Sequence, residues 1–341
     1  MRIKTECVYI KDFKNILVIR PDAIGDLVLT LPAIHAIRKN FPKAKITVLA
    51  REYTRPLLAQ HPDIDEVIYD YALKKYNFDL SVNFYNQFKD TWATFRAGIP
   101  DRLGDSSRIL TGWMNNLRVF RHFEDTNRHE ITLNFDLLAP LRIKEAPQKP
   151  QLIIDQEALS RAKTLLIQPA IKPGDLLAGI HIGSATSKSW DIDGFAKTAN
   201  WLAKEKKYKI LILGSAAEIY RAEKIINLIN IPFINLAGQL PLAELVAMIS
   251  QLDFYLGMDT GPSHLAAALN IPMVMLFLNK QALPTRWGPF KVRHLTVAKQ
   301  KGENNIPFER VIAACDTVLK GGGVTSPEDA LPHWQEQSRG L

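Results

Sequence analysis

The stretch that decides the fold is residues 256–269, Leu-Gly-Met-Asp-Thr-Gly-Pro-Ser-His-Leu-Ala-Ala-Ala-Leu. It continues an apolar run that begins at Phe254 and predicts a buried strand, and its Ala- and Leu-rich end predicts a helix. Pro262 suits the first turn of that helix because it lacks an N–H that would be unpaired there, and Thr260 or Ser263 can cap it. A helix that starts at the carboxyl end of a strand favours a bound anion such as phosphate. An ordinary capped turn fits the same spacing.

Strands and helices alternate along the chain on both sides of this stretch. In the first half we expect strands at 16–20, 45–50, 66–69 and 79–83, and a helix at 27–41. In the second half we expect strands at 178–182, 209–213, 234–236, 254–256 and 273–277, with helices at 195–206, 216–228, 242–251 and 264–269. The alternation predicts an α/β fold with a doubly wound, mostly parallel sheet in each half.

A Pro- and Gly-containing segment, 169–175, separates the two runs and predicts a linker. We therefore expect an N-terminal domain at 1–172 and a second domain at 173–320. After Gly321-Gly322-Gly323 the residues to 341 form a C-terminal tail. A cleft between two such domains is a common place for a ligand.

Composition narrows the class of protein. The 341 residues are 47% hydrophobic and 23% charged, which is typical of a soluble globular protein. No apolar run approaches the roughly 18 residues of a membrane span, and the N-terminus lacks the apolar core of a signal peptide, so we expect a cytoplasmic protein. Cys7 and Cys315 predict neither a disulfide framework nor a metal site. The net charge of +8 is spread over both halves, and we expect no nucleic-acid partner.

Arginines gather in the first half among aromatic residues. Arg102, Arg108, Arg118 and Arg121 lie in the same region as Trp113, Phe120 and Phe123. A solvated, loop-rich face is one interpretation. The other is a patch for an anionic substrate or for a membrane surface.

The turn after the first strand carries a carboxylate in place of a nucleotide motif. No Gly-x-Gly-x-x-Gly follows residues 16–20, and no Gly-Lys-Ser/Thr occurs anywhere, so the sequence gives little support to a dinucleotide site or a P-loop. Ile24-Gly25-Asp26 instead places Asp26 at the start of a helix, as a cap or as a proton acceptor. Asp22, in the same loop, has the features of a turn former.

Together these segments resemble the heptosyltransferases, glycosyltransferase family 9. The resemblance covers residues 16 to about 290, with the segments in the family's order. The matching segments are 16–20 with 24–26, 181–184 with 188–190, 213–218, 235–238 with 242–245, and 257–269. Residues 128–130, Arg-His-Glu, also look like the family's mid-chain segment in the acceptor domain.

The resemblance implies a GT-B enzyme with two Rossmann-like domains that face each other across a cleft. Such an enzyme moves a sugar from a nucleotide donor with inversion at the anomeric carbon. For this family the expected donor is ADP-heptose, and the expected acceptor is the lipopolysaccharide inner core on lipid A. The protein would then work as a peripheral protein at the cytoplasmic face of the inner membrane. The sequence calls for no cofactor and no metal ion.

The resemblance also assigns roles to single residues. Asp26 matches the catalytic base, Lys188 a lysine at the donor phosphates, and Glu218 a glutamate on the ribose hydroxyls. The remaining donor positions are Ser184 on a phosphate-facing loop, Leu240 against the adenine, and Asp259, Thr260, Gly261 and His264 in the donor loop, where Gly261 can take a positive φ. The basic acceptor patch is the set Arg102, Arg108, Arg118 and Arg121.

One segment departs from the family pattern. Where the family continues Phe-Gly-x-Thr after its last strand, this chain has Phe277-Leu278-Asn279-Lys280. Losing the glycine and the hydroxyl leaves a second hypothesis open, a relative that binds nucleotide sugar or glycolipid without turnover. A third hypothesis, a dinucleotide-dependent dehydrogenase, is disfavoured by the missing glycine motif.

Overall fold

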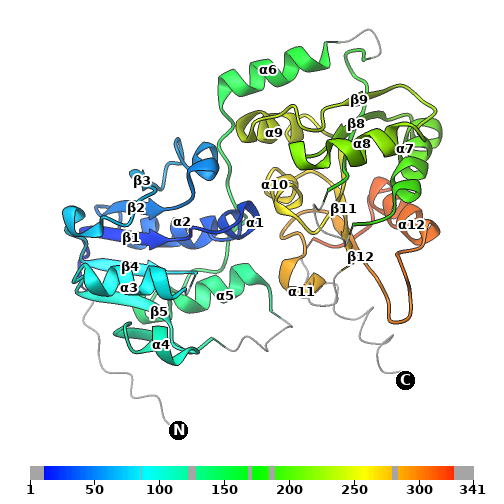
Figure 1. The fold of residues 1–341 in the computed structure, drawn as a ribbon. Coiled ribbons are helices and arrows are strands. Elements are labelled where there is room, and N and C mark those ends of the chain that lie inside the picture. Colours follow the sequence, from blue (N-terminus) through cyan, green and yellow to red (C-terminus); the bar gives the residue numbers. More distant parts are fainter. Residues whose placement is uncertain are drawn as a thin grey trace. The chain divides into compact units, whose positions relative to one another are not determined.

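The computed structural model describes residues 11–85, 87–121, 128–167, 171–183, 189–278 and 283–325. The chain divides into two compact units (Figure 1). The first unit comprises residues 1–125 and 130–150, and the second comprises 126–129 and 151–341. Both are α/β units built on a six-stranded parallel sheet, as the alternation in the sequence predicts.

The sheet of the first unit has the strand order β3-β2-β1-β4-β5-β6. Its strands are β1 (Asn15–Ile19), β2 (Lys45–Leu49), β3 (Glu66–Ile68), β4 (Leu80–Asn83), β5 (Asp101–Asp105) and β6 (Leu117–Val119). The apolar residues of β1 are fully buried, as its uninterrupted apolar sequence predicts. Since the strand order reverses between β1 and β4, a ligand is expected at the carboxyl ends of those two strands.

The helices of the first unit are α1 (Ile24–Val28), α2 (Leu31–Asn40), α3 (Phe88–Arg96), α4 (Ile109–Gly112) and α5 (Glu130–Leu137). Short 3₁₀ turns lie at Glu52–Leu57, Leu73–Tyr76 and Ala139–Leu141. The single helix expected at 27–41 is two helices, α1 and α2. Pro32, in the first turn of α2, has no N–H to extend the hydrogen bonds of α1, so the chain breaks before it.

The second unit repeats the same topology. Its strand order is β12-β11-β10-β7-β8-β9, which matches the first unit when strands are counted from β7. The strands are β7 (Leu177–His181), β8 (Lys209–Leu213), β9 (Phe233–Asn235), β10 (Phe254–Met258), β11 (Met273–Phe277) and β12 (His294–Ala298). Its order therefore reverses between β7 and β10, next to the stretch 256–269.

Seven helices are described in this unit: α6 (Gln156–Leu166), α7 (Ile192–Lys206), α8 (Ile219–Ile226), α9 (Leu242–Ile249), α10 (Gly261–Ala268), α11 (Pro284–Trp287) and α12 (Phe308–Leu319). A 3₁₀ turn, Ala216–Glu218, precedes α8. Helix α6 buries Ala158 and Ala162 and packs against α9. The second unit consequently includes the stretch from Gln151 through α6, which lies on the N-terminal side of the boundary expected between residues 172 and 173.

The start of the expected tail is attached to the second sheet. Val324 pairs antiparallel with His294 at the start of β12, and Gly323 has a φ of +107°. Residues 326–341 lie outside the described part of the chain, as does Cys7, whereas Cys315 is a buried free thiol. No helix within the described residues is long and apolar enough to cross a membrane.

Candidate functional site

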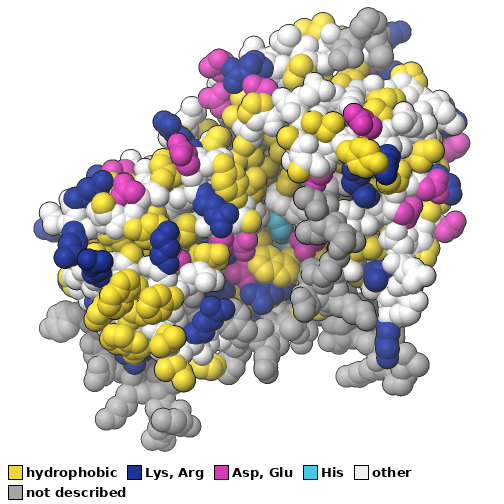
Figure 2. Space-filling model, in the orientation of Figure 1, with side chains coloured by type: hydrophobic (Ala, Val, Ile, Leu, Met, Phe, Trp, Pro, Cys, Tyr) yellow, Lys and Arg dark blue, Asp and Glu magenta, His cyan; other side chains and the backbone are white. Residues whose placement is uncertain are grey.

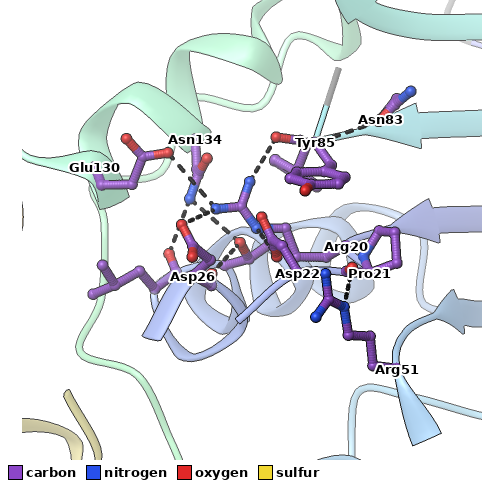
Figure 3. Close-up of polar contacts among 12 residues, drawn as sticks. Arg20, Pro21, Asp22, Asp26, Arg51, Asn83, Tyr85, Glu130 and Asn134 are labelled. Carbon is purple, nitrogen blue, oxygen red and sulfur yellow. Dashed lines mark hydrogen bonds and ion pairs between the residues drawn. The ribbon is translucent and has the colours of Figure 1, made fainter. Parts of the chain in front are cut away.

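The carboxyl edge of the first sheet is organised around one buried arginine. Arg20 directly follows β1, and its Nη1 donates a hydrogen bond of 2.6 Å to the carbonyl oxygen of Phe84, which directly follows β4. The guanidinium therefore joins the two strands at which the sheet order reverses (Figure 3). Arg20 is not among the site residues that the sequence predicts.

Three carboxylates surround this guanidinium. Arg20 Nη2 lies 3.0 Å from Asp26 Oδ1 and 3.8 Å from Glu130 Oε1, and Arg20 Nε lies 3.2 Å from Asp22 Oδ1. Glu130 is also 3.4 Å from Nη2 of Arg121. These five residues, which we call the carboxylate cluster, hold one more carboxyl group than guanidinium groups. Such an excess favours keeping or taking up a proton within the cluster.

Asp26 is the most accessible acid of the carboxylate cluster. Its side chain is 27% exposed, against 10% for Asp22 and 4% for Glu130. It lies in the first turn of α1 but does not cap the helix, because the N-cap residue is Ala23 and no side chain bonds there. Oδ1 accepts from Arg20, and within the described residues Oδ2 accepts no hydrogen bond. An oriented carboxylate with one open oxygen can accept a proton from a bound hydroxyl group.

Asp22 does more than form a turn. It is buried, and burial raises the pKa of its carboxyl group to about 7. Arg20 opposes that rise in pKa, and the negative charges of Asp26 and Glu130 add to it. Asp22 thus exchanges a proton near neutral pH, and it belongs to the same carboxylate cluster as Asp26.

Helix α5 brings the most distant member into the carboxylate cluster. Glu130 is its first residue, and the buried Asn134, one turn on, donates from Nδ2 to the carbonyl oxygen of Leu29 at 3.2 Å. That bond fixes α5 to the residues that join α1 to α2, just after the helix that carries Asp26. A sequence pattern could not reveal this proximity, because it depends on the packing of segments far apart in the chain.

The four arginines of the expected acceptor patch have different surroundings. Arg121 is buried in the carboxylate cluster. Arg102 donates to the carbonyl oxygens of Ile99 and Met114, and burial lowers the pKa of its guanidinium. Arg108 and Arg118 are exposed, although Arg118 also donates from Nε to the carbonyl oxygen of Asn115. Only Arg108 and Arg118 therefore present much of their charge to solvent.

At the carboxyl edge of the second sheet, Glu218 is held between the ends of β7 and β8. Its Oε2 accepts a 2.6 Å hydrogen bond from the N–H of Ser215, in a capping box, and the side chain is buried. Gly183, just after β7, lies so close that a Cβ there would be 1.8 Å from Oε1. Nε2 of His181 is 4.0 Å from Oε2, and burial lowers the pKa of that imidazole. The carboxylate thus has a fixed position at the edge of the sheet.

The donor loop of the sequence analysis joins β10 to α10. Thr260 is the N-cap residue, but its hydroxyl group is directed at the carbonyl oxygen of Met258 and no side chain caps the helix. Ser263 also donates to that carbonyl oxygen. His264 is buried, with Nε2 3.6 Å from Asp259 Oδ1. At the start of α10 the N–H of Ser263 donates to the carbonyl oxygen of Thr260, and Pro262 has no N–H. The N–H of Gly261 is left uncapped by any described side chain and can donate a hydrogen bond to an anion.

The remaining donor residues expected from the sequence differ in how far the structure describes them. Gly261 is the first residue of α10 and is helical, so the positive φ considered for it is wrong. Leu240 is half-buried between β9 and α9. Ser184 and Lys188 lie outside the described residues, and so do Asn279 and Lys280, while Leu278 packs against the core of the unit.

The chain is similar to known proteins in sequence and in fold. The model of glycosyltransferase family 9 (heptosyltransferase) matches residues 70–311. The chain belongs to this family. Lipopolysaccharide heptosyltransferase 2 of Escherichia coli K12 is 27% identical in an alignment of 289 positions that covers 77% of this chain and 82% of that one.

Solved structures show the same fold. A family 9 glycosyltransferase from Veillonella parvula superposes with a TM-score of 0.81 at 21% identity, over 91% of this chain and 98% of that one. E. coli heptosyltransferase WaaC, solved with ADP, gives a TM-score of 0.70 at 14% identity, over 89% and 99%. The fold is therefore GT-B, with two Rossmann-like units, as the resemblance in sequence implies.

Within the described residues, no group of three or more His, Cys, Asp or Glu side chains is placed to hold a metal ion.

Proposed function

We propose that this protein is an inverting glycosyltransferase that transfers heptose from ADP-heptose to the lipopolysaccharide inner core. Membership of the heptosyltransferase family supports the class of reaction. The observation that carries the mechanism is Asp26, a partly exposed carboxylate that Arg20 orients where the first sheet reverses its strand order. That position is where α/β sheets bind their ligands.

In the proposed reaction, Asp26 acts as the general base. A hydroxyl oxygen of the acceptor forms a bond to the anomeric carbon while the bond from that carbon to the diphosphate oxygen breaks. The hydroxyl proton goes to Oδ2 of Asp26, and ADP leaves with the bonding electrons. A single displacement of this kind inverts the anomeric carbon. A positioned base contributes about 10²–10⁴-fold to the rate.

The donor is assigned to the second unit. The uncapped start of α10, with Thr260, Gly261 and His264, would face the diphosphate, and Lys188 would add a cation. Asp259 would orient His264, Glu218 would bind the ribose, Leu240 would lie against the adenine, and Ser184 would contact phosphate. The related WaaC structure contains ADP, which favours an adenine nucleotide over other donors. These groups offset the diphosphate charge without a metal ion.

The acceptor is assigned to the first unit, which also holds Asp26. Arg108 and Arg118 are its exposed cations and would contact the phosphates of the inner core, whereas Arg102 and Arg121 would hold the surrounding chain in place. A lipid A-linked acceptor places the enzyme at the cytoplasmic face of the inner membrane as a peripheral protein.

One experiment tests the proposal and its main rival together. The full-length protein is given ADP-heptose and heptose-deficient lipopolysaccharide, and ADP release and product mass are measured alongside thermal shifts with ADP, UDP, GDP and CMP. We expect stabilisation by ADP and release of ADP only when the acceptor is present. Stabilisation by ADP without any product would instead support a relative that binds but does not turn over. Stabilisation by another nucleotide alone would overturn the donor assignment.

A further inference from the structure

Helix α3 presents its apolar side chains to solvent. Phe88, Trp92 and Phe95 are exposed, whereas Asp90, Thr91 and Thr94 are buried against the unit. A surface helix of a soluble protein normally turns its apolar stripe inward, so the orientation of α3 is reversed.

The buried polar side of α3 is fully engaged, which fixes this orientation. Asp90 Oδ1 accepts a 2.6 Å hydrogen bond from the hydroxyl group of Tyr71. Thr91 Oγ1 accepts from Asn83 Nδ2 at 3.0 Å, and Thr94 donates to the carbonyl oxygen of Thr91. Rotating the helix to hide its aromatic rings would break the bonds from Tyr71 to Asp90 and from Asn83 to Thr91. The exposed rings are therefore a built feature of the surface.

The exposed rings continue onto the neighbouring helix α4. Phe88, Trp92 and Phe95 follow one another with ring centroids about 6 Å apart, and Phe95 meets Trp113 edge-on at 5.2 Å. Beside Trp113, α4 exposes Ile109 and Leu110. We call these six residues, Phe88, Trp92, Phe95, Ile109, Leu110 and Trp113, the aromatic patch. Figure 2 shows hydrophobic side chains gathered over α3 and α4.

Cations border the aromatic patch on one side. A groove of about 520 Å³ runs along Trp92, and its polar walls include Lys74, Lys75, Lys89 and Arg96. None of the described residues that line this groove is acidic. Outside it, Asp70 Oδ2 lies 3.4 Å from Nζ of Lys75. A positive groove beside exposed aromatic and aliphatic side chains suits anionic headgroups lying above acyl chains.

We infer that the aromatic patch and its groove dock the protein on an anionic phospholipid bilayer. Trp and Phe side chains insert at the interface, and the four groove cations hold phospholipid phosphates. A two-fold contact of this surface with itself fits less well, because no described residue of the patch or the groove lining is acidic and could pair with the groove cations of the other copy. The inference deepens the proposed function and rests on it for the bilayer as the place where the acceptor lies.

The first test changes apolar character at one exposed position. Full-length protein is sedimented with vesicles of phosphatidylcholine plus phosphatidylglycerol, and with phosphatidylcholine alone. Ile109→Asp should weaken binding to the anionic vesicles at least about tenfold, because a charge replaces an inserted side chain. The control is Ile167→Asp in the second unit, since Ile167 is 81% exposed and Ile109 is 88% exposed. Equal binding by wild type and both variants would overturn the inference.

The second test changes charge at the groove. Lys74→Glu with Arg96→Glu should also weaken binding to anionic vesicles about tenfold or more, and Lys163→Glu with Lys224→Glu, which makes the same change in net charge elsewhere, should not. Equal losses in both pairs would show a response to net charge only and would overturn the docking site.

Self-association is checked by sedimentation velocity without lipid. A dimer that Ile109→Asp abolishes would mean that the patch contacts a second copy, again overturning the inference. The vesicles contain neither donor nor acceptor, so these outcomes are independent of catalysis. A protein that docks but transfers no heptose leaves the inference standing and defeats the proposed function. A protein that transfers heptose to a soluble acceptor but does not bind vesicles supports the proposed function and overturns the inference.

Discussion

The two units share one strand order, yet the carboxyl edges of their sheets hold different chemistry. In the first unit the point of reversal holds the carboxylate cluster, with Arg20 hydrogen-bonded across from β1 to the end of β4. In the second unit, Asp259 follows β10 and lies beside His264, and the fixed carboxylate of Glu218 lies against Gly183 after β7. No described side chain caps the start of α10 there. One edge is suited to proton transfer and the other to holding an anion, although the backbone topology is the same.

The largest expected effect comes from replacing Asp26, the proposed proton acceptor at the edge of the first sheet. Asp26→Asn keeps the size of the side chain and removes the proton acceptor, so turnover should fall at least about 10²-fold. Binding of ADP, measured by thermal shift of the full-length protein, should stay within about twofold of wild type. Asp193→Asn, an exposed carboxylate on α7, serves as the control and should leave turnover unchanged. Turnover near the wild-type value would remove Asp26 from the mechanism.

The next prediction tests ADP binding through a substitution at the carboxyl edge of the second sheet. Gly183→Ala places a Cβ 1.8 Å from Glu218 Oε1, so the carboxylate must leave the N–H of Ser215. We expect ADP affinity to fall about tenfold and stability to fall by about 1–3 kcal/mol. Affinity is read by calorimetry and stability by chemical unfolding.

Gly214→Ala is the matched control, because its Cβ would lie 3.2 Å from the other oxygen of the same carboxylate. Gly214→Ala should lower ADP affinity and stability much less than Gly183→Ala does. If both variants bind ADP as wild type does, the position of Glu218 is irrelevant to the donor. The proposed ribose contact would then fail.

The sequence predicts the fold well because each central strand is a continuous apolar run flanked by turn residues. It misses β5, β6 and β12, since Asp101-Arg-Leu-Gly-Asp105 is polar and β6 and β12 are short edge strands of their sheets. Family resemblance points to Asp26, but a lone arginine after a strand gives no sign that it will be buried among three carboxylates.

Two further features depend on packing that no local pattern carries. Glu130 reaches the carboxylate cluster only because Asn134 fixes α5 to the junction of α1 and α2. The aromatic residues of α3 have the i, i+4, i+7 spacing of a core stripe, and only the folded unit shows that they point outward. Sequence alone also could not divide the four arginines of the expected acceptor patch into exposed and less exposed members.

A smaller effect is expected at Asp22, whose burial makes the free energy of unfolding depend on pH. Its pKa is about 7 in the folded protein and about 4 in an unfolded chain, so the folded state holds this proton more tightly. Asp22 therefore makes the free energy of unfolding fall as the pH rises from about 4 to about 7. Asp22→Asn removes that fall and should gain about 2–3 kcal/mol relative to wild type between pH 5 and pH 8.

Chemical unfolding of both proteins at several pH values checks this expectation. Asp193→Asn is again the control, because its largely exposed side chain changes surroundings little on folding. A difference between Asp22→Asn and wild type that is constant with pH would show that Asp22 stays charged throughout.

The smallest effect is expected at the exposed arginines, and it separates acceptor recognition from docking on lipid. Arg108→Glu with Arg118→Glu should raise the KM for a delipidated, phosphorylated core oligosaccharide about fivefold, because surface charges are well screened. The defect should grow as salt is lowered, since repulsion is least screened at low ionic strength. The affinity for ADP should not change, because the donor loop belongs to the other unit. Lys163→Glu with Lys224→Glu carries the same change in net charge and controls for long-range repulsion. If both pairs raise KM equally, the first unit attracts the acceptor only through overall charge, and Arg108 and Arg118 belong to a solvated face.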